Sequence, residues 1–147
     1  MGRKWLARAV PADFDLKRFF LEIKTIAVVG YSDKPERAGH YVAHYLADSG
    51  YDVTAINPKF GDEVNGLKCY ANVAAIPAGT PFDVVVVFRA PAFVPEVVAA
   101  AAEMEPRPKY IVMQPGAENP AASQLAREAG IIPLDICMMA MHKVWAH

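Results

Sequence analysis

Residues 25–41 read TIAVVGYSDKPERAGHY. A short apolar run, Ile26 to Val29, ends in Gly30, and a polar loop and a helix-like segment follow. This order of strand, glycine turn and helix is typical of the start of a nucleotide-binding βαβ unit. The next glycine is Gly39, so the G-x-G-x-x-G fingerprint of dinucleotide-binding domains is absent. The stretch therefore indicates a nucleotide-type fold and leaves the ligand open.

Strand-like and helix-like segments alternate through the rest of the chain. The run DVVVVF at 83–88 is typical of a strand buried on both faces. The alternation predicts an α/β fold: one doubly wound, Rossmann-like domain with a five-stranded, mainly parallel sheet and helices on both faces. The predicted strands are 25–29, 51–56, 83–88, 110–113 and 131–134; the predicted helices are 37–49, 95–104, 119–129 and 138–145; and residues 64–76 form a connection with one helical turn.

The chain length of 147 residues fits one domain spanning residues 1–147. Within it, we expect residues 1–23 to form a helical extension packed on the sheet. Apolar residues recur near helical spacing between Phe14 and Ile23, with Asp13 as the expected N-cap. In the last helix, we expect Met138, Met139 and Met141 to pack against the core.

Charge and composition exclude several classes of function. The net charge of −1 makes no global field for nucleic acid or an anionic membrane, so any anion site must be local. No apolar run is long enough to span a bilayer, and no secretory h-region is present. Cys69 and Cys137 lie far apart, which predicts reduced thiols and a cytoplasmic location.

The sequence offers no metal motif and no evident catalytic group. His40 and His44 share a helix face, but two histidines do not make a zinc site, and we expect them at an exposed or half-buried surface. A catalytic pair of Cys137 and His142 would need spatial proximity, and a buried structural thiol is the preferred interpretation. No paired carboxylates suggest an acid and a base, so we predict neither catalytic nor metal-binding residues.

Ligands of open parallel sheets bind outside the carboxyl ends of the strands, so the residues that follow each strand are the candidates. Gly30 permits a tight turn, Ser32 offers a hydroxyl group, and the next helix offers free N–H groups and the positive end of its dipole. The alternative is that Gly30 only ends a strand. The predicted site residues are Gly30, Tyr31, Ser32, Lys34, Pro35, Arg37, Asn57, Pro58, Lys59, Phe88, Arg89, Ala90, Pro91, Gln114, Pro115 and Gly116.

The loop after the second strand distinguishes between nucleotides. NAD-binding domains place an acidic residue here for the ribose hydroxyls, whereas this chain has Asn57, Pro58 and Lys59. A cation favours a nucleotide with an extra ribose phosphate, and both NADP and coenzyme A (CoA) carry one. Lys59 as an ordinary solvated lysine remains an alternative.

For three further features of these loops, the sequence allows both a ligand-binding and a purely structural interpretation. Arg89 directly follows a buried strand, where it contacts a phosphate or pairs with a carboxylate such as Asp33. Lys34 and Arg37 contact a ligand or are solvated. The prolines of the loops stiffen a ligand-binding edge or simply end the strands.

Four motifs in order resemble a known family. They are G-x-S-x-x-P-x-R at 30–37, N-P and G separated by seven residues at 57–66, FDVVVVFRAP at 82–91, and KYIVMQPGA at 109–117; the segment IIPLDICMM at 131–139 follows them. The chain resembles the small stand-alone CoA-binding proteins, which are similar to the N-terminal domain of the succinyl-CoA synthetase α subunit. Tyr31 departs from the family pattern, which has a small residue there, and Met113 stands in place of the usual tryptophan.

The resemblance implies a protein that binds CoA or an acyl-CoA through the loops at the carboxyl ends of the strands. It implies the binding half of a reaction without the reacting half, with a homodimer or a partner enzyme as possible assemblies. Two alternatives stay open at this point: an NADP-dependent oxidoreductase, and a regulatory or interaction module with a vestigial nucleotide pocket.

Overall fold

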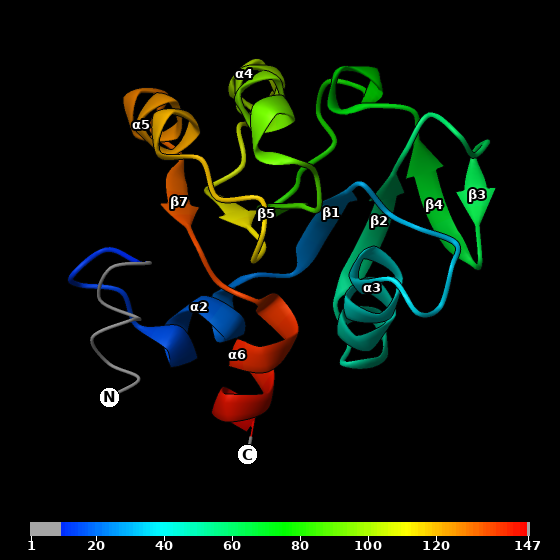
Figure 1. The fold of residues 1–147 in the computed structure, drawn as a ribbon, viewed down its shortest axis with the longest axis horizontal. Coiled ribbons are helices and arrows are strands. Elements are labelled where there is room, and N and C mark those ends of the chain that lie inside the picture. The colour runs from blue at the N-terminus through cyan, green and yellow to red at the C-terminus, as the bar shows by residue number, and fades with distance from the viewer. Residues whose placement is uncertain (1–9, 147) are drawn as a thin grey trace.

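The computed structural model describes residues 10–146, which form a sheet covered by helices on both faces (Figure 1). The helices are α2 (Leu16–Glu22), α3 (Ala38–Asp48), α4 (Val94–Ala102), α5 (Pro120–Glu128) and α6 (Met138–Ala146), with short 3-10 turns η1 (Val73–Ala75) and η2 (Pro91–Phe93). The strands are β1 (Thr25–Val29), β2 (Asp52–Ile56), β3 (Glu63–Val64), β4 (Leu67–Tyr70), β5 (Val84–Val87), β6 (Tyr110–Met113) and β7 (Ile132–Leu134). The part of the extension at 1–9 lies outside the described residues.

The sheet has seven strands in the order β3-β4-β2-β1-β5-β6-β7, so the prediction of five strands was wrong. The two additional strands, β3 and β4, form an antiparallel hairpin in the segment predicted as a connection. Asn65 and Gly66, both with positive φ, make its turn. The other neighbouring strands pair in parallel, which confirms the mainly parallel α/β architecture.

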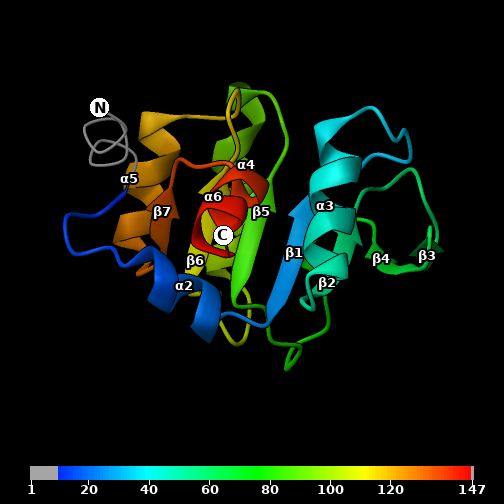
Figure 2. The ribbon, with the colours of Figure 1, turned by 90° about the horizontal axis from the view of Figure 1, so that it is seen from below.

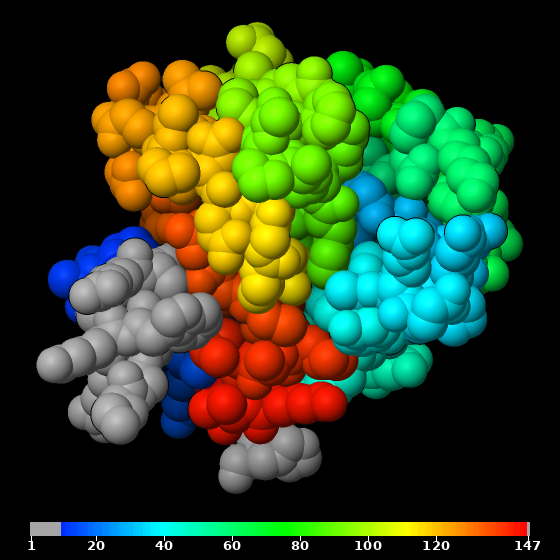
Figure 3. Space-filling model, in the orientation of Figure 1, coloured from blue at the N-terminus to red at the C-terminus, as the bar shows by residue number. Residues whose placement is uncertain are grey.

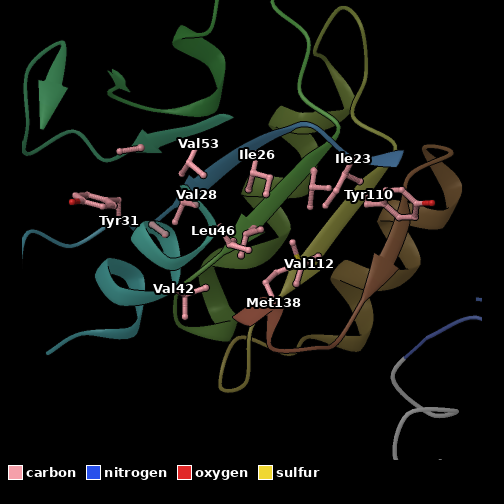
Figure 4. Close-up of a cluster of buried hydrophobic side chains, with 14 of the residues drawn as sticks. Ile23, Ile26, Val28, Tyr31, Val42, Leu46, Val53, Tyr110, Val112 and Met138 are labelled. Carbon is pink, nitrogen blue, oxygen red and sulfur yellow. The ribbon is translucent and has the colours of Figure 1, made fainter. Parts of the chain in front are cut away.

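Alternate residues of the central strands supply two separate cores. Ile26 and Val28 of β1 face a cluster with α2, α3 and α6, whereas Ala27 and Val29 face a cluster with α4 and α5. Figure 2 shows α2, α3 and α6 together on one face of the sheet, and Figure 4 shows residues of that cluster. Met138 is fully buried there and Met139 and Met141 pack against it, as predicted.

Several helix boundaries differ from the prediction by one to three residues. The N-cap of α2 is Asp15, whose carboxylate accepts a hydrogen bond from the Arg18 N–H at 3.1 Å, and not Asp13. Between residues 10 and 146 no helix is both long and apolar enough to cross a membrane.

The chain reverses its direction of travel across the sheet between β1 and β5. From β1 it moves outward to β2 and the hairpin, then returns to β5 on the other side of β1. The loops that leave β1 and β5 therefore diverge, one toward α3 and the other toward α4, on opposite faces. Such a switch point opens a crevice at the carboxyl ends of the strands.

Candidate functional site

A groove of about 470 Å³ lies at this switch point. The loops after β1, β2, β5 and β6 line it, and Figure 3 shows the face on which the segments after β1, β5 and β6 come together. The structure thus brings together the four loops that the sequence selected. Its lining residues are Gly30, Tyr31, Ser32, Asp33, Lys34, Arg37, Ala38, Gly39, Asn57, Lys59, Phe60, Phe88, Arg89, Ala90, Gln114, Pro115, Gly116 and Ala117.

Two glycines let the backbone pack closely at the floor of the groove. Gly30 has a φ of +85°, and a Cβ atom added there would lie 2.3 Å from the Phe88 carbonyl oxygen. A Cβ atom on Gly39, inside the first turn of α3, would lie 2.7 Å from the Gly30 carbonyl oxygen. Both distances are far inside van der Waals contact, so this approach of α3 to the sheet edge requires glycine at both positions.

The loop from Gly30 to Arg37 leaves donors available for an anion. The Ser32 Oγ accepts the Lys34 backbone N–H at 3.1 Å, which leaves the hydroxyl proton free to donate. The N-cap of α3 is Arg37, and no side chain caps the N–H groups of that first turn. Unsatisfied N–H groups and the helix dipole favour negative charge at this position.

Asn57 ties the first two loops together. Its Nδ2 donates to the Tyr31 carbonyl oxygen at 2.8 Å, and its Oδ1 accepts the Lys59 N–H at 2.9 Å. Both ends of the amide are therefore used within the protein. The side chain of Asn57 thus positions the backbone of Tyr31 and Lys59 beside the groove.

The groove is strongly cationic although the chain is nearly neutral. Lys34, Arg37, Lys59 and Arg89 line it against one carboxylate, Asp33. The Arg89 guanidinium lies over the Phe93 ring at 4.5 Å from its centroid. The alternative of an ion pair between Arg89 and Asp33 is wrong: the only ion pairs within residues 10–146 join Arg18 and Lys109 to Glu22.

The fourth loop satisfies most of its own polar groups. The Gln114 side chain is 96% buried, and its Oε1 accepts the Met138 N–H at 2.9 Å, at the start of α6. The Gly116 N–H donates to the Glu118 carboxylate at 2.7 Å. Gln114 thus connects β6 to α6, and this structural role was not visible in the sequence.

A polar network lies behind the first loop, centred on the fully buried Tyr31 side chain. The Tyr31 hydroxyl lies 2.6 Å from His44 Nε2 and 2.9 Å from Asn65 Nδ2, which donates to it. His40 Nδ1 lies 2.9 Å from the Ser32 carbonyl oxygen. The described residues contain no group of three or more His, Cys, Asp or Glu side chains arranged for a metal ion, and the two histidines serve Tyr31 and its loop instead.

Burial shifts the pKa values of this network. Desolvation is the main cause that lowers the pKa of His44, and the neighbouring His40 lowers it further while Asp48 acts in the opposite direction. Desolvation likewise raises the pKa of Tyr31. Both groups are therefore held in their neutral forms near neutral pH.

Three of the predicted site residues lie outside the groove, namely Pro35, Pro58 and Pro91. Pro58 lines a second cavity of about 610 Å³ on the α4 side, which shares Gly30, Asn57 and Arg89 with the groove. Pro91 instead begins η2. Of the four predicted prolines, only Pro115 lines the groove.

Five lining residues were not predicted: Asp33, Ala38, Gly39, Phe60 and Ala117. Gly39 carried a signal, because a second glycine nine residues after Gly30 was visible in the sequence. Asp33 and Ala117 lie inside two of the loops that the sequence selected, although they were not among the predicted site residues. Ala38 and Phe60 carried no signal, because their positions follow from how the loops fold over the edge.

The prediction that Cys137 is a buried thiol was wrong, because Cys137 is only half-buried. Cys69, for which no burial was predicted, is buried. Desolvation raises the pKa of the Cys69 thiol. His142 lies 2.8 Å from the Tyr45 hydroxyl through its Nδ1 atom, which places that nitrogen in a structural contact.

A comparison with known protein families covers all the residues that line the groove. Residues 24–143 match the family model described as CoA binding domain. The chain belongs to this CoA-binding family. The matched range contains all the strands from β1 to β7.

Relatives of known sequence include stand-alone proteins and parts of larger ones. The YneT protein of Bacillus subtilis is 33% identical over 135 residues, which cover 91% of this chain and 96% of that protein. An ADP-forming acetate–CoA ligase of Methanocaldococcus jannaschii is 32% identical over 75 residues. That match covers 51% of this chain and 10% of the ligase, so the ligase has a great deal of chain that this protein does not match.

Solved structures give the same picture. A protein from Pyrococcus horikoshii has a TM-score of 0.83 at 38% identity, covering 90% of this chain and 91% of its own. A Thermus thermophilus protein has a TM-score of 0.75 at 33% identity, covering 90% of this chain and 99% of its own. An acetyl-CoA synthetase of Candidatus Korarchaeum cryptofilum has a TM-score of 0.68 at 30% identity, and the match covers 83% of this chain but 27% of the synthetase.

Proposed function

We propose that this protein binds CoA, or an acyl-CoA, in the groove at the carboxyl ends of β1, β2, β5 and β6. Family membership supports CoA association in general. The observation that carries the more specific proposal is the cationic groove beside the uncapped first turn of α3.

The charge of the groove suits the charge of the ligand. CoA carries a diphosphate and a ribose 3′-phosphate, and four basic side chains line the groove against one acidic one. Arginine and lysine bind phosphate through charge-assisted hydrogen bonds that are stronger than neutral ones. A local cluster of this kind explains how a chain with net charge −1 can bind a polyanion.

The backbone of the groove suits close contact with phosphate. Gly30 and Gly39 bring the start of α3 against the sheet edge. The Ser32 hydroxyl proton has no acceptor within the described residues, and no side chain caps the first turn of α3. Arg89, which stands between the groove and the second cavity, pairs with no carboxylate within the described residues. These donors would hold phosphate oxygens without breaking any contact described above.

We propose a binding role rather than catalysis by this chain alone. In the archaeal ligase and the synthetase, the matched part is a minor share of a longer protein. A homodimer, or a separate enzyme that uses the bound CoA, would supply the remaining chemistry.

The test is isothermal titration calorimetry with CoA, acetyl-CoA and dephospho-CoA, which lacks the 3′-phosphate. We expect saturable binding of CoA and weaker binding of dephospho-CoA. Lys59→Ala should weaken CoA binding by about ten- to hundredfold, the usual size of one charged hydrogen bond, and should remove the preference over dephospho-CoA. Lys17→Ala, a lysine on α2 away from the groove, is the matched control and should leave CoA binding unchanged.

Three results would contradict the proposal, the first two for the ligand and the third for its place in the groove. Lack of saturable CoA binding at millimolar ligand would favour a module whose nucleotide pocket is vestigial. Enhanced NADPH fluorescence on binding, with no heat from CoA, would favour the NADP alternative. Binding of CoA that Lys59→Ala and Lys17→Ala weaken equally would keep CoA as the ligand but move it away from the groove.

A further inference from the structure

The Tyr31 network holds the backbone of the first loop from behind the groove. The Ser32 carbonyl contacts His40 on α3, and the Tyr31 carbonyl accepts the Asn57 amide from the next loop. The Tyr31 ring contacts His44 of α3 and Asn65 of the β3–β4 hairpin through its hydroxyl group. These contacts join α3, the hairpin and two groove loops at one buried side chain.

The chemistry of the donors and acceptors determines the protonation state of His40 at one atom. A carbonyl oxygen only accepts, so the 2.9 Å contact between His40 Nδ1 and the Ser32 oxygen requires a hydrogen on His40 Nδ1. His40 Nδ1 therefore cannot accept the Tyr31 hydroxyl proton, although it lies 3.3 Å from the hydroxyl oxygen.

The same reasoning then determines the state of His44. Asn65 Nδ2 already donates to the Tyr31 hydroxyl, so the remaining acceptor for the hydroxyl proton is His44 Nε2 at 2.6 Å. That atom can accept only when His44 is neutral and carries its proton on Nδ1. A protonated His44 would present a donor to this hydroxyl. In the observed arrangement the buried Tyr31 proton would then have no acceptor.

We propose that Tyr31 and His44 are positioning residues of the CoA-binding loop, and that neutral His44 is required for the loop conformation that binds CoA. This inference depends on the proposed function for its ligand. Acidification would protonate His44, release the Tyr31 ring from α3, and loosen the backbone of Tyr31 and Ser32 at the groove. CoA affinity would therefore fall as the pH falls.

The surrounding charges agree with this direction. The His44 ring lies 4.3 Å from the His40 ring, centroid to centroid, and contacts the Tyr31 hydroxyl of the first loop. Asp48 of the same helix acts on it electrostatically. Asp33 and Cys69 act electrostatically on Tyr31, and both raise its pKa. Burial and His40 together lower the pKa of His44 despite Asp48, so the midpoint of its protonation lies below the ordinary value of 6.5. The effect therefore belongs to the range below about pH 6.5.

The experiment compares wild type with His44→Gln by calorimetry with CoA at pH 8.0 and pH 5.5. Glutamine can present an oxygen acceptor near the position of His44 Nε2 and does not titrate. We expect CoA binding by wild type to weaken about five- to tenfold more than binding by His44→Gln over this range. The 3′-phosphate of CoA also titrates near pH 6, but the comparison removes that effect because both proteins bind the same ligand. Circular dichroism at both pH values checks that each protein remains folded.

A second variant and a ligand-free measurement separate the possible failures. Tyr31→Phe has no hydroxyl proton to satisfy, so the pH dependence of its CoA binding should match that of His44→Gln, which is weaker than that of wild type. In ligand-free protein, nitrogen NMR should show His44 protonated on Nδ1 at pH 8. An equal pH dependence in wild type and His44→Gln, or a His44 protonated on Nε2, would overturn this inference while leaving CoA binding intact. No CoA binding at pH 8.0 would overturn the proposed function, and this inference with it.

Discussion

Two loops at the same edge of the sheet, residues 30–37 after β1 and residues 114–117 after β6, both contain a glycine with positive φ. Their surroundings differ. A Cβ atom at Gly30 would lie 2.3 Å from the Phe88 carbonyl oxygen, whereas one at Gly116 would meet nothing within 4 Å. Gly30 therefore serves both backbone conformation and space, and Gly116 serves backbone conformation alone.

The polar groups of the two loops differ in the same way. In the first loop, the Ser32 hydroxyl proton has no acceptor within the described residues, and no side chain caps the start of α3. In the fourth loop, Glu118 accepts the Gly116 N–H and Gln114 accepts the Met138 N–H. A strand followed by a glycine turn can thus build either an anion-receptive loop or a turn that satisfies itself. Only the internal partners of each loop distinguish the two.

The largest expected effect tests the two glycines directly. Gly30→Ala would place a methyl group against backbone at a position with φ of +85°, and the free energy of unfolding should fall by at least about 3 kcal/mol. Gly116→Ala incurs only the conformational cost, about 1–2 kcal/mol. Urea denaturation of both variants measures the difference. Equal losses would show that backbone conformation alone explains both glycines.

The next effect tests the structural role of Gln114. Gln114→Leu removes the acceptor of the buried Met138 N–H and should lower the free energy of unfolding by about 1–3 kcal/mol. Gln114→Glu keeps an acceptor oxygen and should retain more of the stability when its carboxyl is protonated, at low pH. If Gln114→Leu were as stable as wild type but bound CoA more weakly, Gln114 would belong to the ligand and not to α6.

The smallest effect concerns Asp135, which follows β7 near the fourth loop. Its Oδ1 is buried without a hydrogen-bond partner within the described residues, and burial, with Glu118 as a second cause, raises the pKa of its carboxyl. A raised pKa means that the folded state binds the proton more tightly than the unfolded chain. The Asp135 contribution to stability therefore decreases as the pH rises from about 4 through the pKa in the folded state.

Asp135→Asn should remove that loss. Its melting temperature should exceed that of wild type by a few degrees at pH 7, and the gain should shrink toward pH 4. Calorimetric melting across this range checks the sign. A gain that grows toward low pH would contradict the assignment of a raised pKa to Asp135.

Much of the architecture could be predicted from local patterns. The run DVVVVF became β5, buried on both faces, and the apolar spacing after Arg37 became α3. The sequence prediction missed the β3–β4 hairpin. A turn signal was present, because Asn-Gly is a favoured pair for a two-residue hairpin turn. The flanking strands of two and four residues were too short to show a period.

For the groove, the sequence predicted the loops better than the roles within them. Ligand loops of a parallel sheet lie at strand carboxyl ends whatever the detailed packing, so position alone selected most of the lining residues. The roles of Asn57 and Gln114 could not be predicted, because a side-chain amide on a loop makes the same kinds of hydrogen bond to a ligand as to a neighbouring backbone.

The sequence by itself determined the order of strands and helices, the edge where the groove lies, and the excess of basic residues there. Each of these follows from residues that are close together in the chain. Only the tertiary structure decided what Gly30 faces, which polar atoms are already used, and how Tyr31 is held. Those answers depend on partners that are distant in sequence: Phe88 for Gly30, Met138 for Gln114 and Asn65 for Tyr31. Local sequence patterns carry little information about such pairs, because folding brings the two partners together from distant parts of the chain.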